Sequence, residues 1–365
     1  MRIAIAIKGL GVAGGVAEIV FVEIASGLAA RGHAVSAISY DWPEQVSFYP
    51  LAPAVDWVRL GVGRTYKPAR LLESASRIGA LRRTVQQLTL DIVMGFMHSM
   101  FIPLGLALVG LRVPMIASEH IGLTHFSRRP LQRGLMRLSP LLVRRITVVT
   151  DQIRAEFPPS LRKRMVVIPN PVSQPATPLA DTIGSELPRK MLLSVGLFGE
   201  QRDFPPLIRA FASIAGAVPD WYLRIVGDGD LRPHLEELVA QSQLTDRVVL
   251  PGATKNIGAQ YAAAQLFVLP SSYESLGLVL IEALAHGLPA VGFADCLGVN
   301  LLIRPGWNGV LVSGPDRVVA LGEALLSLMV DGRRAALIPA EPKIPPEFGC
   351  VQALDQWEDL LACCT

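Results

Sequence analysis

Short apolar runs alternate with amphipathic segments along the chain. One series of these alternations occupies the first half of the chain, and a second series occupies the other half. Between the first two runs, Val20, Ile24 and Leu28 recur at helical spacing. Strand–helix–strand units of this kind favour a parallel sheet with right-handed crossovers. Because 51% of the residues are hydrophobic and 18% are charged, there is enough apolar surface for strands buried on both faces. In the first half we expect strands at residues 2–7, 34–39, 92–96, 114–117, 146–149 and 165–168.

Two proline-rich breaks divide the chain, one at 170–190 and one at 339–346. Between them, strands are expected at 192–195, 221–226, 248–250, 267–270 and 289–292. A length of 365 residues fits two domains better than one core. We therefore expect an α/β fold of two Rossmann-like, doubly wound domains that face each other across a cleft. Their predicted bounds are an N-terminal domain at 1–172, a linker at 173–190, a C-terminal domain at 191–338, and a tail at 339–365 whose helix packs back toward the N-terminal domain.

The composition and the first residues argue against several classes of protein. A formal net charge of +3 argues against nucleic acid as a partner. The four cysteines match neither a disulfide framework nor a zinc site. The first residues read as a buried strand instead of a secretory signal, so we expect a cytoplasmic protein. The uncharged stretch 92–111 is interpreted as a strand followed by a helix, with a membrane-spanning helix as the alternative.

The most informative stretch, residues 271–289, follows an apolar strand and contains two glutamates, Glu274 and Glu282. A helix is expected to begin near Gly277, which would leave the first backbone amides at the positive end of the helix dipole. Such a helix start can bind a diphosphate, and two carboxylates beside it can accept hydrogen bonds from sugar and ribose hydroxyls. The alternative is an amphipathic helix with two solvated acids.

This stretch resembles the donor signature of family-4 retaining glycosyltransferases, which have the GT-B fold. Residues 225–231, 249–252, 306–312 and 354–357 are similar to other parts of that family's second domain. In the first domain, Gly14 and Gly15 followed by Glu18, and residues 28–33, resemble the family's opening loop and helix. The resemblance therefore covers nearly the whole chain.

The resemblance implies an enzyme that transfers a hexose or N-acetylhexosamine from a nucleotide sugar, with a UDP-sugar expected, to a hydroxyl group with retention of configuration. It places the acceptor on the first domain and the nucleotide sugar on the second. The implied acceptor is a polysaccharide or a lipid-linked glycan, and the nucleotide sugar is a substrate, so no cofactor is expected. Two alternatives remain: a GT-B relative that epimerises or phosphorolyses a sugar, and a catalytically weak nucleotide-sugar-binding subunit that supports an active partner.

The resemblance also implies roles for the residues of the motif. Glu274 would hold hydroxyls of the transferred sugar, and Glu282 would hold the ribose of the nucleotide. The diphosphate would contact the backbone amides of Gly277, Leu278 and Val279.

Two glycines of the first domain are implied as further donor contacts. Gly14 and Gly15 would bring backbone close to the phosphates, which glycine permits because it has no Cβ atom. A flexible turn after the first strand is the alternative for this pair.

The chain departs from the family pattern at one position. Family members have an arginine and a lysine after the strand at 192–195, where this chain has Leu197 and Arg202. Arg202 can still neutralise a leaving diphosphate, whereas Leu197 cannot, and one lost contact of this kind typically costs about 2–4 kcal/mol of transition-state stabilisation. The alternative for Arg202 is a solvated surface residue.

Further candidates lie after other strands. The resemblance implies that His120 lines the cleft near the reacting sugar, with a structural hydrogen-bonding role as the alternative. Glu119 and His98 are candidates for acceptor contacts. Lys255 and Asn256 occupy a loop that faces the nucleobase in the family, and a plain surface loop is the alternative.

Asp228-Gly229-Asp230 spells a D-x-D sequence, a pattern that binds a metal ion in the other large glycosyltransferase fold. Here it lies in a glycine turn between a strand and a helix, where turn and N-cap roles account for both aspartates. We therefore expect no metal site and metal-independent transfer.

Residues 128–145 contain six arginines and no acidic residue, interleaved with leucines. A basic amphipathic helix of this composition can lie on an anionic membrane, and the family resemblance favours peripheral contact at the inner face. The alternative is a helix that packs on the sheet and exposes its basic face to solvent.

Overall fold

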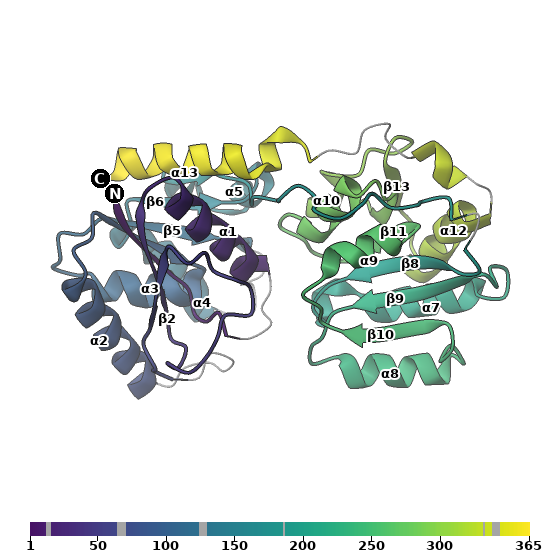
Figure 1. Ribbon diagram of the computed structural model, residues 1–365, viewed down its shortest axis with the longest axis horizontal. Coiled ribbons are helices and arrows are strands. Elements are labelled where there is room, and N and C mark those ends of the chain that lie inside the picture. The colour runs from purple at the N-terminus through teal and green to yellow at the C-terminus, as the bar shows by residue number, and fades with distance from the viewer. Residues whose placement is uncertain (12–15, 64–70, 124–129, 185–186, 331–332, 338–343) are drawn as a thin grey trace. The chain divides into compact units, whose positions relative to one another are not determined.

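The computed structural model describes residues 1–11, 16–63, 71–123, 130–184, 187–330, 333–337 and 344–365 (Figure 1). The chain forms two compact units. The first contains Met1–Pro171 together with Pro346–Thr365, and the second contains Val172–Pro345.

The first unit is built on a seven-stranded sheet in which all neighbouring strands are parallel. The strand order is β3-β2-β1-β4-β5-β6-β7. The central strands β4 and β5 are buried along their whole length, as expected for strands covered on both faces. The bounds are β1 (Arg2–Ala6), β2 (Ala34–Ser39), β3 (Val55–Arg59), β4 (Ile92–Phe96), β5 (Met115–Glu119), β6 (Arg145–Val148) and β7 (Met165–Val167).

The helices of the first unit lie on both faces of this sheet. Helix α1 connects β1 to β2, toward the β3 edge of the sheet, whereas α3 connects β4 to β5, toward the β7 edge. Because both crossovers are right-handed, these two helices lie on opposite faces of the sheet. The bounds are α1 (Val16–Ala30), α2 (Leu71–Gln87), α3 (His98–Ala107), α4 (Pro130–Leu138), α5 (Asp151–Glu156), α6 (Pro159–Arg162) and α13 (Cys350–Cys364), with short 3₁₀ helices at Ser139–Leu141 and Pro346–Phe348.

The second unit has a six-stranded parallel sheet with the order β10-β9-β8-β11-β12-β13. Its strands are β8 (Lys190–Val195), β9 (Trp221–Val226), β10 (Val248–Gly252), β11 (Leu266–Leu269), β12 (Ala290–Phe293) and β13 (Gly309–Val312). Its helices are α7 (Phe204–Ile214), α8 (Arg232–Gln241), α9 (Ile257–Ala263), α10 (Leu278–Ala285), α11 (Leu297–Asn300) and α12 (Arg317–Val330), with 3₁₀ helices at Glu200–Arg202 and Arg333–Leu337. The expectation of two doubly wound α/β folds is confirmed.

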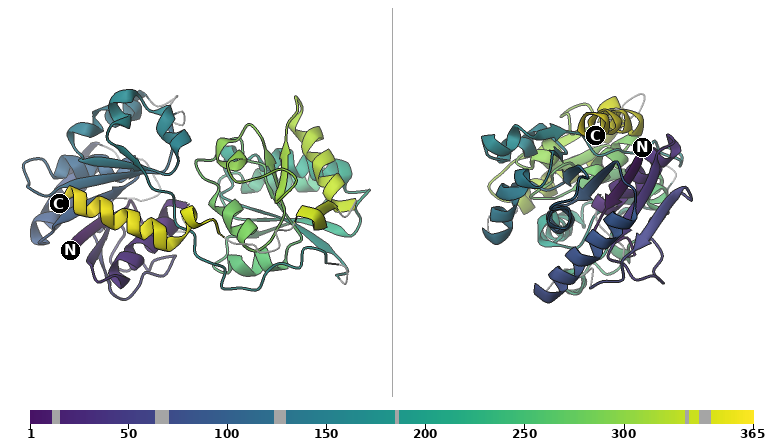
Figure 2. Two further views of the ribbon diagram at one scale, coloured as in Figure 1. Left: turned by 90° about the horizontal axis from the view of Figure 1, so that it is seen from above. Right: turned by 90° about the vertical axis from the view of Figure 1, so that its left-hand side faces the viewer.

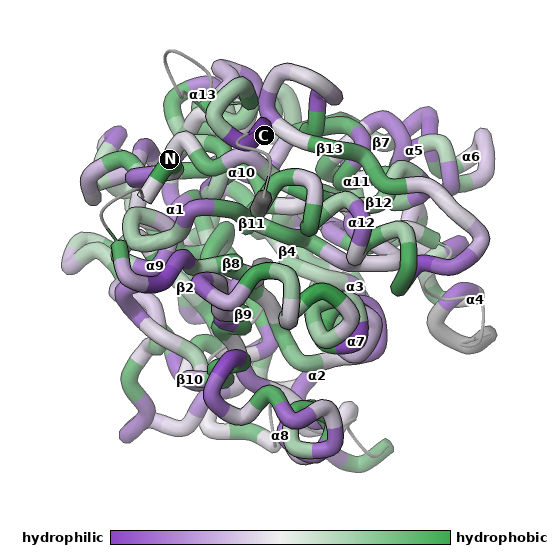
Figure 3. The backbone as a smooth tube through the Cα atoms, turned by 90° about the vertical axis from the view of Figure 1, so that its right-hand side faces the viewer, coloured by the Kyte–Doolittle hydropathy of each residue, from purple (hydrophilic) through white to green (hydrophobic). Residues whose placement is uncertain are grey.

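The apolar runs of the sequence form the centre of each sheet. Strands β8 and β11 run as hydrophobic, green tubes in Figure 3, and every residue of β11 and β12 is buried. Burial of this apolar surface is the main favourable contribution to folding. Among the described residues, no helix is both long enough and apolar enough to cross a bilayer.

The structure departs from the sequence-based expectations at two places in the first unit. Strand β3 was not predicted, because it is an edge strand in which only Val55 is buried and its apolar residues do not form a run. The segment 128–145 is not one helix: α4 ends at Leu138, a 3₁₀ turn follows, and β6 begins at Arg145. Pro140 explains the break, since it lacks the N–H that a continuing helix needs.

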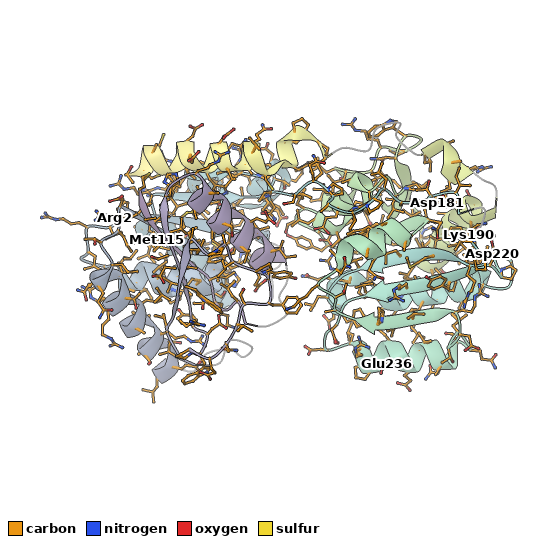
Figure 4. All side chains as sticks on the ribbon, viewed as in Figure 1. Arg2, Met115, Asp181, Lys190, Asp220 and Glu236 are labelled. Atoms are coloured by element: carbon orange, nitrogen blue, oxygen red, sulfur yellow. The ribbon has the colours of Figure 1, made fainter. Side chains whose placement is uncertain are left out.

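The segment 173–190, for which a linker is predicted, lies within the second unit. The Gln265 side chain donates to the carbonyl of Asp181 at 3.0 Å. At the amino ends of β8 and β9, Lys190 pairs with Asp220 at 3.1 Å (Figure 4).

The last helix, α13, packs on the first unit beside α1 (Figures 1 and 2). Trp357 is 2% exposed, and its ring stacks on Phe96 of β4 at a centroid distance of 6.3 Å. Arg31, which follows α1, donates hydrogen bonds to Asp355 and Glu358 of α13. The final residues of the chain therefore complete the core of the first unit.

We expect Trp357→Ala to lower the free energy of unfolding of the first unit by about 3–5 kcal/mol, because it removes a buried aromatic side chain. Urea unfolding followed by far-ultraviolet circular dichroism measures this change. Val351→Ala is the matched control in the same helix, since Val351 is 70% exposed, and it should alter stability by no more than about 0.5 kcal/mol. Equal effects of the two substitutions would contradict the assigned packing.

Candidate functional site

The strand order of the second sheet reverses between β8 and β11, which are neighbours although α7 to α9 separate them in sequence. In open α/β sheets, ligands bind outside the carboxyl ends of the strands at such a reversal. The segments that leave these two carboxyl ends are 196–203 and 270–277, and they contain Arg202 and Glu274.

The Arg202 and Glu274 side chains meet at this edge. The guanidinium group of Arg202 forms an ion pair with the Glu274 carboxylate, and their side chains are 16% and 8% exposed. The hydroxyl of Ser271 also donates to Glu274 Oε1, at 2.8 Å. A buried carboxylate needs such partners, because an isolated buried charge is strongly unfavourable. The structure thus brings two sequence-predicted residues into direct contact.

Backbone packing fixes the position of Glu274. The amide of Gly298, in α11, donates to the Glu274 carbonyl oxygen at 3.1 Å. A Cβ atom added to Gly298 would lie 2.6 Å from that oxygen, a separation that real Cβ atoms do not show. Glycine at 298 therefore permits the close approach of α11 to the Glu274 loop.

Helix α10 begins beside this loop, with Gly277 at its N-cap position and no side-chain cap. The amide of Leu278 donates to the carbonyl of Leu276 at 2.9 Å, so this amide is already used in a tight turn. Gly277 and Leu278 are buried, whereas Val279 is partly exposed. Of the three predicted backbone contacts, Val279 has the most accessible position.

Glu282 lies within α10 and is held by a tyrosine that no sequence motif indicates. The Tyr261 hydroxyl, on α9, donates to Glu282 Oε2 at 2.7 Å. Burial, with Glu282 as a further cause, raises the pKa of Tyr261 well above its usual value, so this hydroxyl stays protonated and remains a donor. Tyr261 is the sole residue of α9 with both an aromatic ring and a hydroxyl group, which is the only local signal for such a role.

Two further features of the second unit bear on the site: Leu197 and the D-x-D turn at residues 228–230. Leu197 is 58% exposed in the segment that follows β8. In the D-x-D turn, Asp228 accepts hydrogen bonds from the Gly229 amide and from Arg232 Nε, both at 2.8 Å. Among the described residues, no group of histidine, cysteine and acidic side chains has metal-site geometry.

The two residues predicted to contact the nucleobase lie in the loop after β10. Asn256 is the N-cap of α9, where its side-chain oxygen accepts from the Ala259 amide at 3.3 Å. Lys255 is exposed. The cap accounts for the Asn256 side chain structurally, and Asn256, like Lys255, is exposed.

In the first unit, Glu119 ends β5 and is fully buried. One carboxylate oxygen accepts from the amides of His120 and Ile121, at 3.0 and 3.1 Å. The other accepts from the amide and the ring Nδ1 of His98, at 3.2 and 3.3 Å. These bonds fix the orientation of the His98 ring, because Nδ1 must carry its proton toward the carboxylate. Glu119 is therefore a buried organiser of the segments after β4 and β5.

Met97 lies between β4 and His98 and has φ 63° and ψ 148°. A non-glycine residue in this region is strained, and such strain is concentrated at functional sites. The carboxyl edge of the first sheet therefore shows strained backbone next to a histidine whose ring orientation is fixed.

His120 is buried, its Nε2 lies 3.0 Å from the Ser118 hydroxyl, and its ring stacks on Phe96. Burial lowers the pKa of His120 to about 4, against a smaller opposing effect of Glu119. This histidine is therefore neutral at physiological pH. The remaining predicted donor residues, Gly14 and Gly15, lie outside the described residues.

The pH dependence of stability should report the buried state of His120. Between about pH 6.5 and pH 4 the unfolded chain binds a proton at this residue and the folded chain does not, so the free energy of unfolding falls as the pH is lowered, by about 1.4 kcal/mol per pH unit. We expect His120→Asn to remove this part of the slope in urea unfolding at a series of pH values. His234→Asn, at an exposed histidine, should retain it, and an unchanged slope in His120→Asn would contradict burial.

Comparisons with known proteins identify the family and agree with the fold. Residues 189–331 match the family model described as glycosyl transferases group 1, and residues 13–174 match that of glycosyltransferase family 4. An uncharacterised glycosyltransferase of Haemophilus influenzae is 26% identical over 99% of both chains. A Campylobacter jejuni N-acetylgalactosaminyltransferase, named for an undecaprenol-diphosphate-linked glycan, is 25% identical over 99% of this chain and 98% of its own.

Among solved structures, Anabaena HepE in complex with UDP and glucose superposes with a TM-score of 0.79, at 18% identity and over 99% of both chains. The two family models together cover the chain from residue 13 to residue 331 except for 175–188. The protein therefore belongs to glycosyltransferase family 4 and has the GT-B fold.

Proposed function

We propose that this glycosyltransferase transfers a hexose or N-acetylhexosamine from a nucleotide sugar to a hydroxyl of a polysaccharide or lipid-linked glycan, with retention of configuration. The observation that carries the proposal is the meeting of Arg202 and Glu274 at the strand-order reversal, beside the uncapped start of α10. This edge offers a cation and backbone dipoles for a diphosphate, and a carboxylate for hydroxyl groups.

In the proposed donor complex, Arg202 and the α10 start stabilise the leaving diphosphate as its charge develops. The guanidinium fork can bind phosphate while its other edge stays near Glu274. Glu274 would then accept a hydrogen bond from a sugar hydroxyl and keep its bond from Ser271. Glu282, held by Tyr261, would accept from the ribose hydroxyls.

The proposed nucleotide is UDP. HepE, a relative in fold, has been solved with UDP and with UDP-glucose, which supports the choice without placing a base in this chain. Lys255, exposed after β10, is the proposed contact to the nucleobase. No cofactor is proposed, because the nucleotide sugar is itself the activated substrate.

The proposed acceptor contact is His98. The Glu119 carboxylate is fully buried and accepts four hydrogen bonds, so its influence on an acceptor would pass through the His98 ring that it orients. A lipid-linked acceptor is supported by the name of the Campylobacter relative, which acts on an undecaprenol-linked glycan.

Leu197 favours a second candidate function, a catalytically weak subunit that binds a nucleotide sugar and supports an active partner. Its exposed apolar side chain stands where family members have an arginine. Arg202 would then neutralise the leaving group alone.

We further propose that transfer needs no metal ion. Asp228, the first acid of the D-x-D turn, is engaged by Arg232 at 2.8 Å, and Arg232 also pairs with Glu236. An arginine in contact with the carboxylate opposes binding of a cation at the same oxygen atoms.

Peripheral contact with the inner face of the membrane is proposed for the basic segment that ends in the 3₁₀ helix at 139–141. Arg133 and Arg137 are exposed, and two leucines beside them, Leu138 and Leu141, are 56% and 81% exposed. Cationic and apolar side chains on one short segment suit the interface of an anionic bilayer.

The transfer reaction is tested by incubating the protein with UDP-, GDP- and ADP-linked hexoses and N-acetylhexosamines and measuring release of nucleoside diphosphate. We expect release from a UDP-sugar, unchanged by a metal chelator, and a loss of about 100-fold or more in kcat/KM for Glu274→Gln and Arg202→Met. Glu236→Gln is the matched control, because Glu236 also pairs with an arginine but lies on α8.

The protein could bind a nucleotide sugar but neither release nucleoside diphosphate nor transfer the sugar, even with glycan acceptors and cell extract present. That result would favour the non-enzymatic candidate. Full turnover by Glu274→Gln would contradict the assigned role of this carboxylate. A metal requirement would contradict the proposed metal-independent mechanism.

Membrane contact is tested by sedimentation with vesicles of phosphatidylcholine that contain phosphatidylglycerol. We expect Leu138→Ser combined with Leu141→Ser to lower the bound fraction, because each exposed leucine loses its apolar contact with the interface. Val351→Ser, at another exposed apolar residue of the first unit, should bind as the unmodified protein does. Vesicle binding that is insensitive to the leucine changes would assign the contact elsewhere.

A further inference from the structure

Arg317, the first residue of α12, contacts all three loops that follow β8, β11 and β12. Its Nη1 lies 3.0 and 2.8 Å from the two oxygens of Asp295. Its Nη2 lies 3.5 and 3.4 Å from the carbonyl oxygens of Pro270 and Ser271, and 3.6 Å from Asp203 Oδ2. One side chain thus connects three separate segments of the second unit.

The packing of Arg317 restricts its guanidinium group. The group lies 3.5 Å from the ring centroid of Phe293, the last residue of β12, and the side chain is 27% exposed. Stacking on an aromatic face and several directed N–H groups suit a planar guanidinium, whereas a lysine could not reproduce them.

Two of the three loops carry the candidate site. Asp203 directly follows Arg202, and its backbone is left-handed, with φ 49° and ψ 37°. This conformation is uncommon outside glycine, although aspartate adopts it more readily than most residues do. Ser271, whose carbonyl contacts Arg317, donates its hydroxyl to Glu274. Arg317 therefore touches the immediate neighbours of both members of the Arg202–Glu274 pair.

The two loops also contact each other directly. The Ser272 amide donates to the Gln201 carbonyl at 3.0 Å, and the Ser272 hydroxyl lies 3.3 Å from the same oxygen. Gln201 precedes Arg202 and Asp203 follows it, so this connection and Arg317 hold the segment on both sides of Arg202.

We infer that Arg317 is a positioning residue that keeps the Arg202 loop and the Glu274 loop in register for donor binding. The expected effect of Arg317 on catalysis rests on the proposed function. Its expected effect on the stability of the two loops rests on geometry alone. Arg317 is not proposed as a second cation for the diphosphate, because Asp203 and Asp295 balance its charge. A simple surface ion pair would involve only Asp295, which is 71% exposed, and would contribute little.

The structural consequence is tested by hydrogen exchange and mass spectrometry on the ligand-free full chain. We expect Arg317→Met to speed exchange by about tenfold or more in peptides covering 199–206 and 270–277, because local opening of these loops becomes easier. Arg334→Met is the matched control. Arg334 also lies over an aromatic ring, that of Trp221, and bonds backbone carbonyls, but it contacts neither loop.

The inference would be overturned if both peptides exchange as slowly in Arg317→Met as they do in Arg334→Met. If Arg317→Met fails to fold, Arg317→Lys is measured in its place, since it keeps the charge and loses the planar fork. These readouts need no substrate.

The catalytic consequence is tested with the donor sugar identified by nucleotide release. We expect Arg317→Lys to lower kcat by about tenfold or more with a smaller change in KM, because misplacement of Arg202 and Glu274 acts on the transition state. Asp295→Asn should remain within about twofold of the unmodified protein in both constants. Normal kcat in Arg317→Lys would overturn the inference and leave the proposed function intact. Inactivity of the unmodified protein toward every donor would count against the proposed function. In that case the hydrogen-exchange result decides the inference.

Discussion

Parallel pairing of β11 with β8 determines where the chemical groups of the second unit lie. Leu266 and Phe267 stand opposite Leu192 and Leu193, and all four side chains are fully buried. This pairing makes the two strands end at the same edge of the sheet, although the chain between them forms two other strands. The segments that follow the two strands must then share one region of space, and Arg202 meets Glu274 because of it.

The buried Glu274 carboxylate places a demand on its surroundings. Its side chain is 8% exposed, so its charge must be balanced nearby, and Arg202 supplies the balance. The family pattern has two cations in this region, but the chain has Leu197 in place of one of them. A single cation therefore serves both the resting carboxylate and, in the proposed reaction, the departing diphosphate. This double use makes the placement of Arg202 more consequential than it would be in a site with two cations.

The sequence predicts the fold well where the signal is local and less well where it depends on distant partners. The buried strands, the start of α10 and the two glutamates follow from short patterns of apolar residues, glycine and acids. Strand β3 has no such pattern, because an edge strand needs only one buried residue, Val55. The hydrogen bond from Tyr261 to Glu282 and the contacts of Arg317 join residues that are far apart in sequence, and periodicity carries no information about such pairs.

The first unit contains the two ends of the chain, since α13 packs on α1 while the second unit lies between them in sequence. During synthesis on the ribosome, α13 emerges after the whole second unit, so the ring of Phe96 lacks its contact with the indole of Trp357 until then. The second unit, which is a continuous segment, can close its own core earlier. The second unit can therefore complete its core before the first, and the nascent first sheet keeps apolar surface uncovered until α13 has emerged.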